Sequence, residues 1–404
     1  MPRVDSQQRV LSGMRPTGRL HLGHLHGVLK NWIKLQDEYE CFFFVADWHA
    51  LTTHYGEPNL FEENTIDMVI DWLAVGVSPE SAALFVQSEV PEHAELHLLL
   101  SMTTPLSWLE RVPSYKDQQE KLRERELDTY GFLGYPLLQA ADILIYQSGN
   151  VPVGADQVAH VELTREVARR FNHIYGREPG FEEHAGAAIR KMGKKAGKLY
   201  SQLRTAYTEQ GDQEALEKAR KLLTEQQNIS IEDRERLYGY LEGGGQMILA
   251  EPKALLTPSS KMPGLDGQKM SKSYNNTISL REPLDEVKKK ISTMPTDPAR
   301  VRLVDPGDPE KCPVWQLHQA YSDEITKNWV MEGCKSAGIG CLECKSPVID
   351  AVITELEPIQ KEAVQYEKDP DLVRSIIADG SEMARESAKE TLADVRAAMG
   401  LNKW

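Results

Sequence analysis

RVLSGMRPTGRLHLGHLHGVLKNWIKLQ, residues 9–36, decides how the first part of this chain folds. RVLSG is typical of a short strand that ends in a turn. A Pro/Gly loop follows, and apolar residues then recur at helical spacing, at Leu25, Val28, Leu29, Trp32 and Leu35. The stretch therefore predicts a strand, a loop and a helix, in the order that opens an α/β sheet.

The same alternation continues downstream. CFFFVADWHAL, residues 41–51, is a continuous apolar run that ends in polar groups, as expected of a buried parallel strand with functional side chains at its carboxyl end. Cys41 is expected to be a small core residue. A helix near 59–75 and a strand in SAALFVQ, residues 81–87, follow. We therefore predict an α/β fold with a Rossmann-like, doubly wound parallel sheet.

The chain of 404 residues is too long for one compact core, so several domains are expected. EALEKARKLLTEQ, residues 214–226, predicts an amphipathic helix with one apolar face, made of Leu216, Ala219, Leu222 and Leu223. Beyond Ser279, apolar stripes suit a helical bundle. We predict a catalytic domain in two parts, a helical insert and a C-terminal all-helical domain, at 1–182 with 247–281, 183–246 and 282–404 respectively.

Composition restricts the classes of partner. A net charge of −14 argues against a non-specific nucleic-acid coat protein, and DNA is not an expected partner. No run of about 18 apolar residues predicts a membrane span, and the first residues lack an apolar segment, so we expect a cytoplasmic protein. One stretch is basic without any acid, and it is either a solvated helix face or a local basic surface: Arg190, Lys191, Lys194, Lys195, Lys198 and Arg204.

PTGRLHLGH, residues 16–24, places two histidines three residues apart at the start of the predicted helix. A helix N-terminus offers unpaired N–H groups and the positive end of the helix dipole, which suit a phosphate. Gly23 would let an adenine ring approach the backbone closely, and His21 and His24 could donate hydrogen bonds to phosphoryl oxygens. The alternative is a pair of histidines that are hydrogen-bonded locally.

GQKMSKSYNN, residues 267–276, holds two lysines around Met270 and Ser271. Lys269 and Lys272 are point charges on flexible stems, which suit a departing pyrophosphate. A surface basic loop is the alternative for this stretch taken alone. Together with residues 16–24, however, the loop would clamp a nucleoside triphosphate from both sides.

These two motifs, HLGH and KMSKS, resemble the signature pair of the class I aminoacyl-tRNA synthetases. Further stretches are similar to the bacterial tryptophanyl-tRNA synthetases, over roughly 9–182 and 247–400 but not over the insert: YPLLQAADILIY (135–146), VPVGADQVAHVELTREVARRFN (151–172), LLTPSSKMPGLDGQKMSKSYNNTI (255–278) and TDPARVRLVDPGDP (296–309). The resemblance implies ATP, Mg²⁺, L-tryptophan and tRNA(Trp) as ligands and a homodimer as the assembly.

The resemblance also implies roles for individual residues. Asp142 would accept the indole N–H, which is only a donor and therefore needs an acceptor. Tyr135 and Gln157 would hold the amino group and carboxylate of the amino acid, and Asp47 and His49 would line its pocket. Lys116 would reach the phosphates, although it could also be a solvated charge. ATP contacts are expected from Arg15, Thr17, Gly23, His24, Gly154, Ala155, Asp156, Met262, Lys269, Met270, Ser271 and Lys272.

Gln139 departs from the family pattern, because many members have methionine there. A glutamine one turn before Asp142 is similar to the tyrosyl enzymes, which read a phenol hydroxyl with a Gln and an Asp. The AAD and GADQ sequences, in contrast, are similar to the tryptophanyl enzymes. We expect tryptophan, with tyrosyl-type specificity as the alternative.

Four of the five cysteines fall close together, at Cys312, Cys334, Cys341 and Cys344. Such spacing in a cytosolic chain suggests a metal more than disulfides, and four thiolates suit zinc or a four-iron, four-sulfur cluster. Some tryptophanyl enzymes carry such a cluster with a first gap one residue longer. A cluster, a group of free thiols and zinc are expected in that order.

The sequence thus predicts a ligase that joins tryptophan to tRNA through an adenylate. Two alternatives stay open. A nucleotidyltransferase would share HxGH without charging tRNA, although the long helical C-terminal part speaks against it. A non-catalytic paralogue would bind RNA or tryptophan, although the intact HLGH, GADQ and KMSKS sequences speak against that.

Overall fold

The computed structural model describes residues 6–57, 61–112, 129–154, 157–176, 180–241, 247–256 and 262–401. Its centre is a five-stranded parallel sheet with the strand order β3-β2-β1-β4-β5. The strands are β1 (Arg9–Met14), β2 (Glu40–Val45), β3 (Ala82–Val86), β4 (Asn150–Val153) and β5 (Lys253–Leu256). The order runs outward from β1 in both directions, as in a doubly wound fold.

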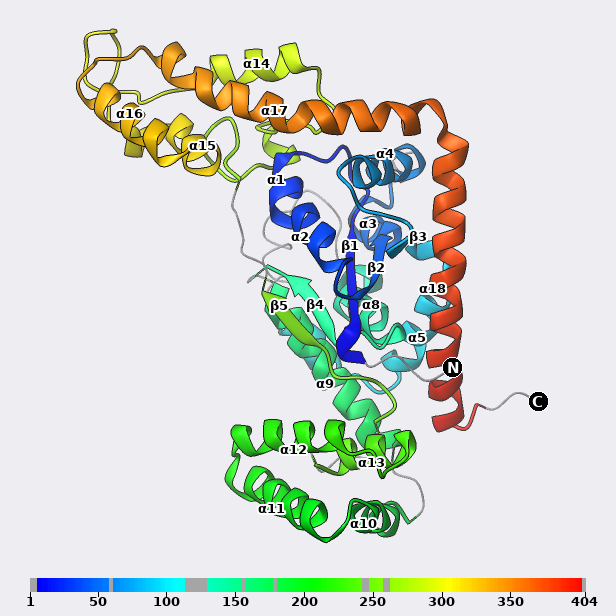
Figure 1. Ribbon diagram of the computed structural model, residues 1–404. Helices are drawn as coiled ribbons and strands as arrows, with labels where there is room; N and C mark the ends of the chain where they lie inside the picture. Colours follow the sequence, from blue (N-terminus) through cyan, green and yellow to red (C-terminus); the bar gives the residue numbers. More distant parts are fainter. Residues whose placement is uncertain are drawn as a thin grey trace.

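Helices cover both faces of this sheet (Figure 1). One face packs against α1 (Leu22–His24), the π-helical turn η2 (Leu25–Leu29), α2 (Lys30–Leu35) and α4 (Phe61–Ala74). The other packs against α5 (Glu92–Ser101), α6 (Leu106–Glu110), α8 (Tyr130–Ile145) and α9 (Val158–Tyr175). Alternate residues of β2 supply the two cores: Phe43 stacks on Trp32 at 4.1 Å between ring centroids, and Phe42 stacks on Tyr146 at 4.6 Å. Short elements at strand ends are η1 (Ser6–Gln8), α3 (Asp47–His54) and η4 (Gln87–Glu89).

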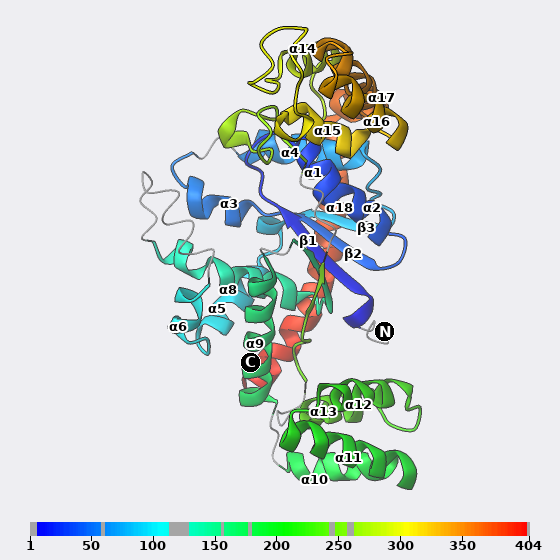
Figure 2. The same cartoon turned by 90° about the vertical axis from the view of Figure 1, so that its left-hand side faces the viewer.

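The insert is a group of four helices with a core of its own, set apart from the sheet in both views (Figures 1 and 2). They are α10 (Phe181–Lys191), α11 (Lys194–Gln210), α12 (Gln213–Glu225) and α13 (Ile231–Leu241). On α12, Leu216, Ala219 and Leu223 are buried in that core, and Leu222 packs against it, as the amphipathic pattern predicted.

After the sheet, the chain forms a second helical region above it (Figure 1). Its elements are η6 (Lys272–Tyr274), α14 (Leu284–Thr293), η7 (Pro309–Lys311), α15 (Pro313–Tyr321), α16 (Glu324–Lys335) and α17 (Cys341–Lys368). Glu355 of α17 accepts hydrogen bonds from Lys30 at 2.5 Å and from Tyr321 at 2.7 Å, and its other contact is His26 at 2.8 Å. These contacts tie the helical region to the helix that follows HLGH.

The last helix, α18 (Pro370–Ala398), returns to the sheet and runs beside β3 (Figure 1). Val373 and Ile377 join the core on one face of the sheet, whereas Ala384 and Ala388 join the core on the other. Gly380 lies at the crossing, where a Cβ atom would overlap the Leu84 carbonyl. Glycine is therefore required for this close approach.

The predicted α/β fold with its parallel sheet is confirmed, and so is the burial of Cys41. Two features were not predicted. The strand β5 was not predicted because it is short and half-exposed, and its sequence therefore lacks a long apolar run like that of β2. The helix α18 shares its core with the sheet, although the domain boundaries proposed from sequence assign it to a separate helical domain. Within the described part of the chain, no helix is long and apolar enough to cross a membrane.

Candidate active site

The predicted site residues gather at the carboxyl ends of β1, β2 and β4. HLGH follows β1, α3 with Asp47 and His49 follows β2, and Gly154 follows β4. The chain leaves β1 and β4, which are neighbours in the sheet, toward opposite faces. This position, where the strand order reverses, is where open α/β sheets bind their ligands.

His21 and His24 cap the short helix α1 reciprocally. The backbone N–H of Gly23 donates to Nδ1 of His21 at 3.1 Å, and the backbone N–H of His21 donates to Nδ1 of His24 at 3.2 Å. Because each Nδ1 accepts, the proton of each neutral ring is on Nε2. The local bonding that was the alternative to phosphate binding is present, and it leaves both Nε2–H groups as donors. Capping and donation to a ligand are thus compatible in one ring.

Both rings are held neutral. Burial, followed by the positive charges of Lys272 and Lys269, lowers the pKa of His21 to about 4. Burial and the neighbouring His21, Lys272 and Lys269 lower the pKa of His24 well below its ordinary value. At neutral pH the site therefore presents two neutral N–H donors beside two lysines.

The KMSKS loop lies against HLGH. The strand-like residues after it pair with the HLGH segment, since Leu22 N–H donates to the Ile278 carbonyl at 3.0 Å. The Lys272 side chain extends to the loop between β1 and HLGH, where its Nζ donates to the Gly18 carbonyl at 2.6 Å. Lys269 is exposed, whereas Met270 and Met262 are buried and their backbones pair at 3.3 Å. The two motifs thus form one surface.

Packing around position 23 also explains why this residue is a glycine. A Cβ atom there would come within 2.8 Å of the His21 ring and 3.4 Å of Met270. A side chain would therefore displace the His21 ring from its place at the helix start. This packing requirement adds to the predicted approach of an adenine ring to the backbone.

Asn276 organises the KMSKS loop, and the sequence analysis did not identify it. Its Oδ1 accepts from the Ser271 N–H at 2.8 Å, and its Nδ2 donates to Asp266 at 2.8 Å and to the Lys269 carbonyl at 3.2 Å. The side chain is buried, and Gly264 leaves room for it. One asparagine thus holds both limbs of the loop that carries the lysines.

Asp142 lies at the other end of the site, on α8, and is 1% exposed. Its Oδ1 accepts from Gln87 Nε2 at 2.8 Å and contacts His93 Nδ1 at 2.7 Å, and its Oδ2 contacts His49 Nε2 at 2.7 Å. Burial alone would raise the pKa of Asp142, but the hydrogen bonds from His49 and His93 outweigh it and hold the pKa below its ordinary value. The carboxylate is therefore ionised and acts only as an acceptor.

The other residues predicted to hold the amino acid have partners of their own. The Tyr135 ring meets the His49 ring edge-on at 6.2 Å between centroids, and its hydroxyl is 3.4 Å from His160 Nε2. Gln157 is the N-cap of α9, and Gln139 is half-buried on α8. Asp47 is tied to the backbone instead, since its Oδ1 accepts from the N–H groups of Trp48 and Ser88.

Three predicted positions, Lys116, Ala155 and Asp156, lie outside the described residues. Arg15 and Thr17 lie in the loop between β1 and HLGH, where Thr17 N–H donates to the Arg15 carbonyl at 2.8 Å. Arg15 interacts electrostatically with Lys272 of the KMSKS loop and with Tyr135 on α8, so it lies between HLGH and the Asp142 end.

The four cysteines gather around the starts of α15 and α17 and the end of α16. Burial and the nearby Cys312, Cys334 and Cys341 raise the pKa of Cys344 to about 12. The Cys344 sulfur also lies 3.5 Å from His318 Nε2. The thiol donor set suits a soft metal. Among the described residues, however, no three His, Cys, Asp or Glu side chains are arranged to hold a metal ion.

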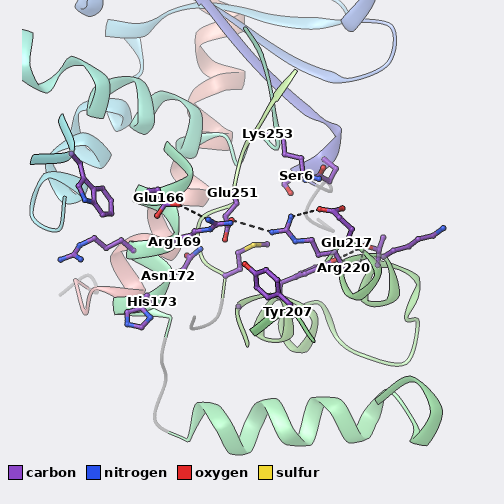
Figure 3. Close-up of a pocket in the computed structure, with 18 residues that line it drawn as sticks. Ser6, Glu166, Arg169, Asn172, His173, Tyr207, Glu217, Arg220, Glu251 and Lys253 are labelled. Carbon is purple, nitrogen blue, oxygen red and sulfur yellow. Dashed lines mark hydrogen bonds and ion pairs between the residues drawn. The ribbon is translucent and has the colours of Figure 1, made fainter. Parts of the chain in front are cut away.

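A cavity of about 600 Å³ lies away from these residues, between α9, β5 and the insert (Figure 3). Glu251 bridges it: its Oε2 is 2.8 Å from Arg169 on α9 and 3.9 Å from Arg220 on α12. Ion pairs with Glu166 and Glu217 extend this chain at either end (Figure 3). None of the predicted site residues that the structure describes lines the cavity, so we assign it to the junction between insert and sheet.

Sequence comparison adds a family assignment to this geometry. The family model for class I tRNA synthetases (W and Y) matches residues 4–236 and 212–357. The tryptophan–tRNA ligase of Ralstonia nicotianae is 67% identical over 394 residues, which cover 98% of each chain. That of Thermotoga maritima is 44% identical, with 97% of this chain and 99% of the relative covered.

A solved structure shows the same architecture. The crystal structure of tryptophanyl-tRNA synthetase from Campylobacter jejuni, in complex with ADP and tryptophan, is 27% identical and superposes with a TM-score of 0.72. The similarity covers 97% of this chain and 99% of that one. The match therefore includes the sheet, the helices around it and the region that carries the candidate site.

Proposed function

The chain belongs to the class I tRNA synthetases of the tryptophan and tyrosine group, and on that premise we propose that it joins L-tryptophan to tRNA(Trp) at the expense of ATP. The choice of tryptophan over tyrosine rests on the identity of 67% and 44% to tryptophan–tRNA ligases, and Asp142, a buried and ionised carboxylate on α8, supplies a suitable acceptor for the indole. An indole N–H needs an acceptor of this kind, and a ring without a donor would leave it unpaired.

In the first step, a carboxylate oxygen of tryptophan attacks the α-phosphorus of ATP in line. The bond from that phosphorus to the bridging oxygen breaks, and pyrophosphate leaves with the electron pair while tryptophanyl-adenylate forms. Bound Mg²⁺ would share the negative charge of the phosphates. The protein's own part is positioning and electrostatic stabilisation.

We assign the phosphate end of this reaction to HLGH and KMSKS. The Nε2–H groups of His21 and His24 would donate to phosphoryl oxygens, which neutral rings can do without repelling the lysines. Lys269 and Lys272 would neutralise the departing pyrophosphate. The roles of Arg15, Thr17, Gly154, Ala155, Asp156, Met262 and Lys116 in holding ATP stay as the family resemblance implies them.

In the second step, the terminal ribose hydroxyl of the tRNA attacks the adenylate, and AMP leaves. We propose that the helical region after residue 282 reads the anticodon and that the reaction takes place in the cytoplasm. The contacts of Glu355 with Lys30 and His26 connect that region to the helix behind HLGH, which supports a single ligand spanning both.

We also propose that the basic end of the insert touches tRNA. Lys194, Lys195 and Lys198 on α11 are exposed, whereas Lys191 is paired with Asp233 at 2.6 Å. Reversing Lys194 and Lys198 to glutamate should weaken tRNA binding and reduce its salt dependence. Reversing Lys218 and Lys221 on α12 is the matched control, and equal affinities of the two double variants at low and moderate salt would contradict this contact.

The assembly is proposed to be a homodimer. An apolar hollow of about 420 Å³ lies among α3, α5 and α8, and its lining residue Tyr55 is 55% exposed. The packed helices α5, α6 and α8 carry further exposed apolar side chains at their surface or ends: Leu98, Met102, Leu106 and Tyr130. Exposed apolar surface of this kind fits a second copy. Light scattering should give a dimer for the wild type and a monomer for Met102→Glu with Leu106→Glu, with Ile325→Glu as a control that stays dimeric.

The metal prediction for Cys312, Cys334, Cys341 and Cys344 stays a proposal, with an iron–sulfur cluster ahead of free thiols and zinc. Its support is the donor set and the mutual influence of the four thiols. Anaerobically purified protein would show a broad visible absorbance and bound iron if a cluster is present. Colourless protein with bound zinc, or with neither metal, would contradict the cluster.

Amino-acid-dependent ATP–pyrophosphate exchange tests the central proposal, with tryptophan and tyrosine in parallel. Exchange with tryptophan alone is expected. Exchange with tyrosine would mean that Gln139 outweighs the AAD and GADQ sequences, and absence of exchange with either would favour a non-catalytic paralogue. Charging of tRNA then separates a synthetase from a nucleotidyltransferase.

A further inference from the structure

The side chain proposed to read the indole already has its hydrogen-bonding capacity largely used. Asp142 meets three donors, from Gln87, His93 and His49, without any ligand. A substrate N–H must therefore replace one of these donors or share an oxygen with it. The donor that gives way determines how the site selects the ring of the amino acid. The inference that follows rests on the proposed function, because it takes tryptophan as the substrate.

The two carboxylate oxygens differ in their surroundings. Oδ1 is held by Gln87 at 2.8 Å and by His93 at 2.7 Å, and both side chains are 0% exposed. Among the described residues, Oδ2 is held by His49 alone, at 2.7 Å, and the His49 side chain is 11% exposed. His49 also faces the Tyr135 ring, whose predicted role is to hold the amino acid. The exchangeable partner is therefore on Oδ2.

A further buried side chain fixes the orientation of His93. Nδ1 of His93 must donate to Asp142, because an ionised carboxylate only accepts. The other ring nitrogen of His93, Nε2, lies 2.7 Å from the Tyr146 hydroxyl, within hydrogen-bond distance. Burial, with the negative charges of Asp142 and Glu92, raises the pKa of Tyr146 well above its ordinary value, so the hydroxyl keeps its proton. Tyr146, His93 and Oδ1 thus form a continuous buried chain of hydrogen bonds.

We propose that Oδ1 of Asp142 is an anchor and Oδ2 the atom that reads the substrate, with His93 and Tyr146 as positioning residues that hold the carboxylate in its reading orientation. His49 occupies Oδ2 in the empty site and yields it to the indole N–H. The orientation matters because a carboxylate free to rotate could offer its oxygens to other donors.

Selection then follows from an exchange of hydrogen bonds. An indole N–H replaces the bond that His49 gives up, so the number of bonds to Oδ2 is conserved. A ring of equal shape without a donor must either leave His49 in place, in the space the ring needs, or leave Oδ2 buried and unpaired. An unpaired buried acceptor is costly. Losing the hydrogen bonds to Oδ1 should weaken the discrimination between rings with and without an N–H. It should not change KM for ATP.

The test compares tryptophan with 3-(benzothiophen-3-yl)alanine, in which sulfur replaces the N–H. The measured quantity is kcat/KM for tryptophan divided by kcat/KM for the analogue, both in ATP–pyrophosphate exchange. We expect Tyr146→Phe to lower the ratio about three- to tenfold and His93→Leu about 100-fold. His93→Asn should be intermediate, because its amide can still donate to Oδ1 but cannot meet Tyr146. KM for ATP should stay within about twofold in all three.

Tyr200→Phe is the matched control. Tyr200 is also 0% exposed, and its hydroxyl donates to the Leu237 carbonyl at 2.6 Å, but it lies in the core of the insert. It should leave the ratio unchanged. A merely structural role for Tyr146 would lower kcat/KM for both amino acids equally, so an unchanged ratio in Tyr146→Phe overturns the inference. The ring stack with Phe42 survives that substitution, which keeps the variant foldable.

The wild-type protein separates this inference from the proposed function. If the wild type shows no tryptophan-dependent exchange, the proposed function itself is wrong. If it shows exchange but treats the two substrates alike, Oδ2 does not read the N–H and the inference is wrong. If it discriminates and the ratio falls in the order His93→Leu, His93→Asn, Tyr146→Phe, from most to least affected, both are supported.

Discussion

The two ends of the candidate active site are built in opposite ways. At the phosphate end, short backbone segments and glycines bring HLGH and KMSKS together, and Lys269 is exposed. At the Asp142 end, three helices and η4 bury a carboxylate that already accepts three hydrogen bonds. The difference suits the two proposed tasks. A leaving group is met by charges that can follow it and release it, whereas a ring is selected by a carboxylate that is held in one orientation.

The largest effect should come from breaking the Asp142 end. Asp142→Asn replaces one of the two carboxylate oxygens with an NH₂ group, which is a donor. Either His49, which meets Oδ2, or Gln87 and His93, which meet Oδ1, would then face a donor in place of an acceptor. We expect kcat/KM for tryptophan in exchange to fall about 1,000-fold, with KM for ATP nearly unchanged. Steady-state exchange at varied tryptophan and varied ATP measures both. A rise in KM for ATP with an unchanged kcat/KM for tryptophan would reverse the assignment of the two ends.

At the phosphate end, Lys272→Ala removes the charge that spans the two motifs. We expect kcat of exchange to fall about 100-fold, because a donor to developing charge is lost, while the selectivity for tryptophan over benzothienylalanine is kept. Lys289→Ala, a change of equal charge on exposed α14, is the control. If Lys272→Ala altered the selectivity ratio, the two ends would not be independent.

The pH profile sharpens the same contrast. Burial, partly offset by Asp71 and reinforced by Arg15, lowers the pKa of Lys272 to about 8. Lysine is charged below its pKa, so kcat/KM for ATP should be maximal below pH 8 and fall up to about tenfold per pH unit above it. His21, with a pKa of about 4, stays neutral throughout this range. Lys272→Arg should remove the alkaline limb, and its persistence would assign the limb to another group.

Asn276→Ala tests whether the loop must be organised before ATP arrives. The substitution removes the side chain that receives Ser271 N–H and donates to Asp266 and the Lys269 carbonyl. We expect KM for ATP to rise about tenfold and KM for tryptophan to stay constant. Equal rises in both constants would indicate a general loss of folding, which circular dichroism at the assay temperature would reveal.

The smallest effect should follow from a change outside both ends. Glu251→Gln weakens the ion pairs with Arg169 and Arg220 at the insert junction, which are partly exposed. We expect about 0.5–1 kcal/mol of lost stability and exchange constants within about twofold of the wild type. Thermal unfolding with exchange kinetics measures the two. A large kinetic effect would show that the junction is coupled to the active site.

Local patterns were sufficient to predict several of the elements and to locate two short motifs, HLGH and KMSKS. The apolar run of β2, the helical spacing after HLGH and the amphipathic face of α12 each depend on neighbours in sequence, and each formed as expected. HLGH and KMSKS could be found because short motifs carry their chemistry in consecutive residues. Their contact, Lys272 with Gly18, then follows from the parallel sheet.

The supporting side chains could not be predicted in this way. Gln87, His93 and Tyr146 are separated along the chain and meet only because α5, η4 and α8 pack on one face of the sheet. Nothing in the residues around His93 distinguishes it from an ordinary core histidine. Asn276 is closer to a detectable signal, since it lies five residues after Ser271 in a turn-rich stretch, but its partners depend on the folded loop.

The crossing of α18 over the sheet has a consequence for the life of the chain before it is complete. β3 is an edge strand, and unpaired edges recruit strands from other molecules. The helix that shields this edge comes after the sheet and the KMSKS loop in the chain, so it is synthesised after them. Until Gly380 can seat against Leu84, the nascent protein presents an open template for aggregation. Protection of this edge from self-association therefore requires α18, which is made after HLGH and KMSKS.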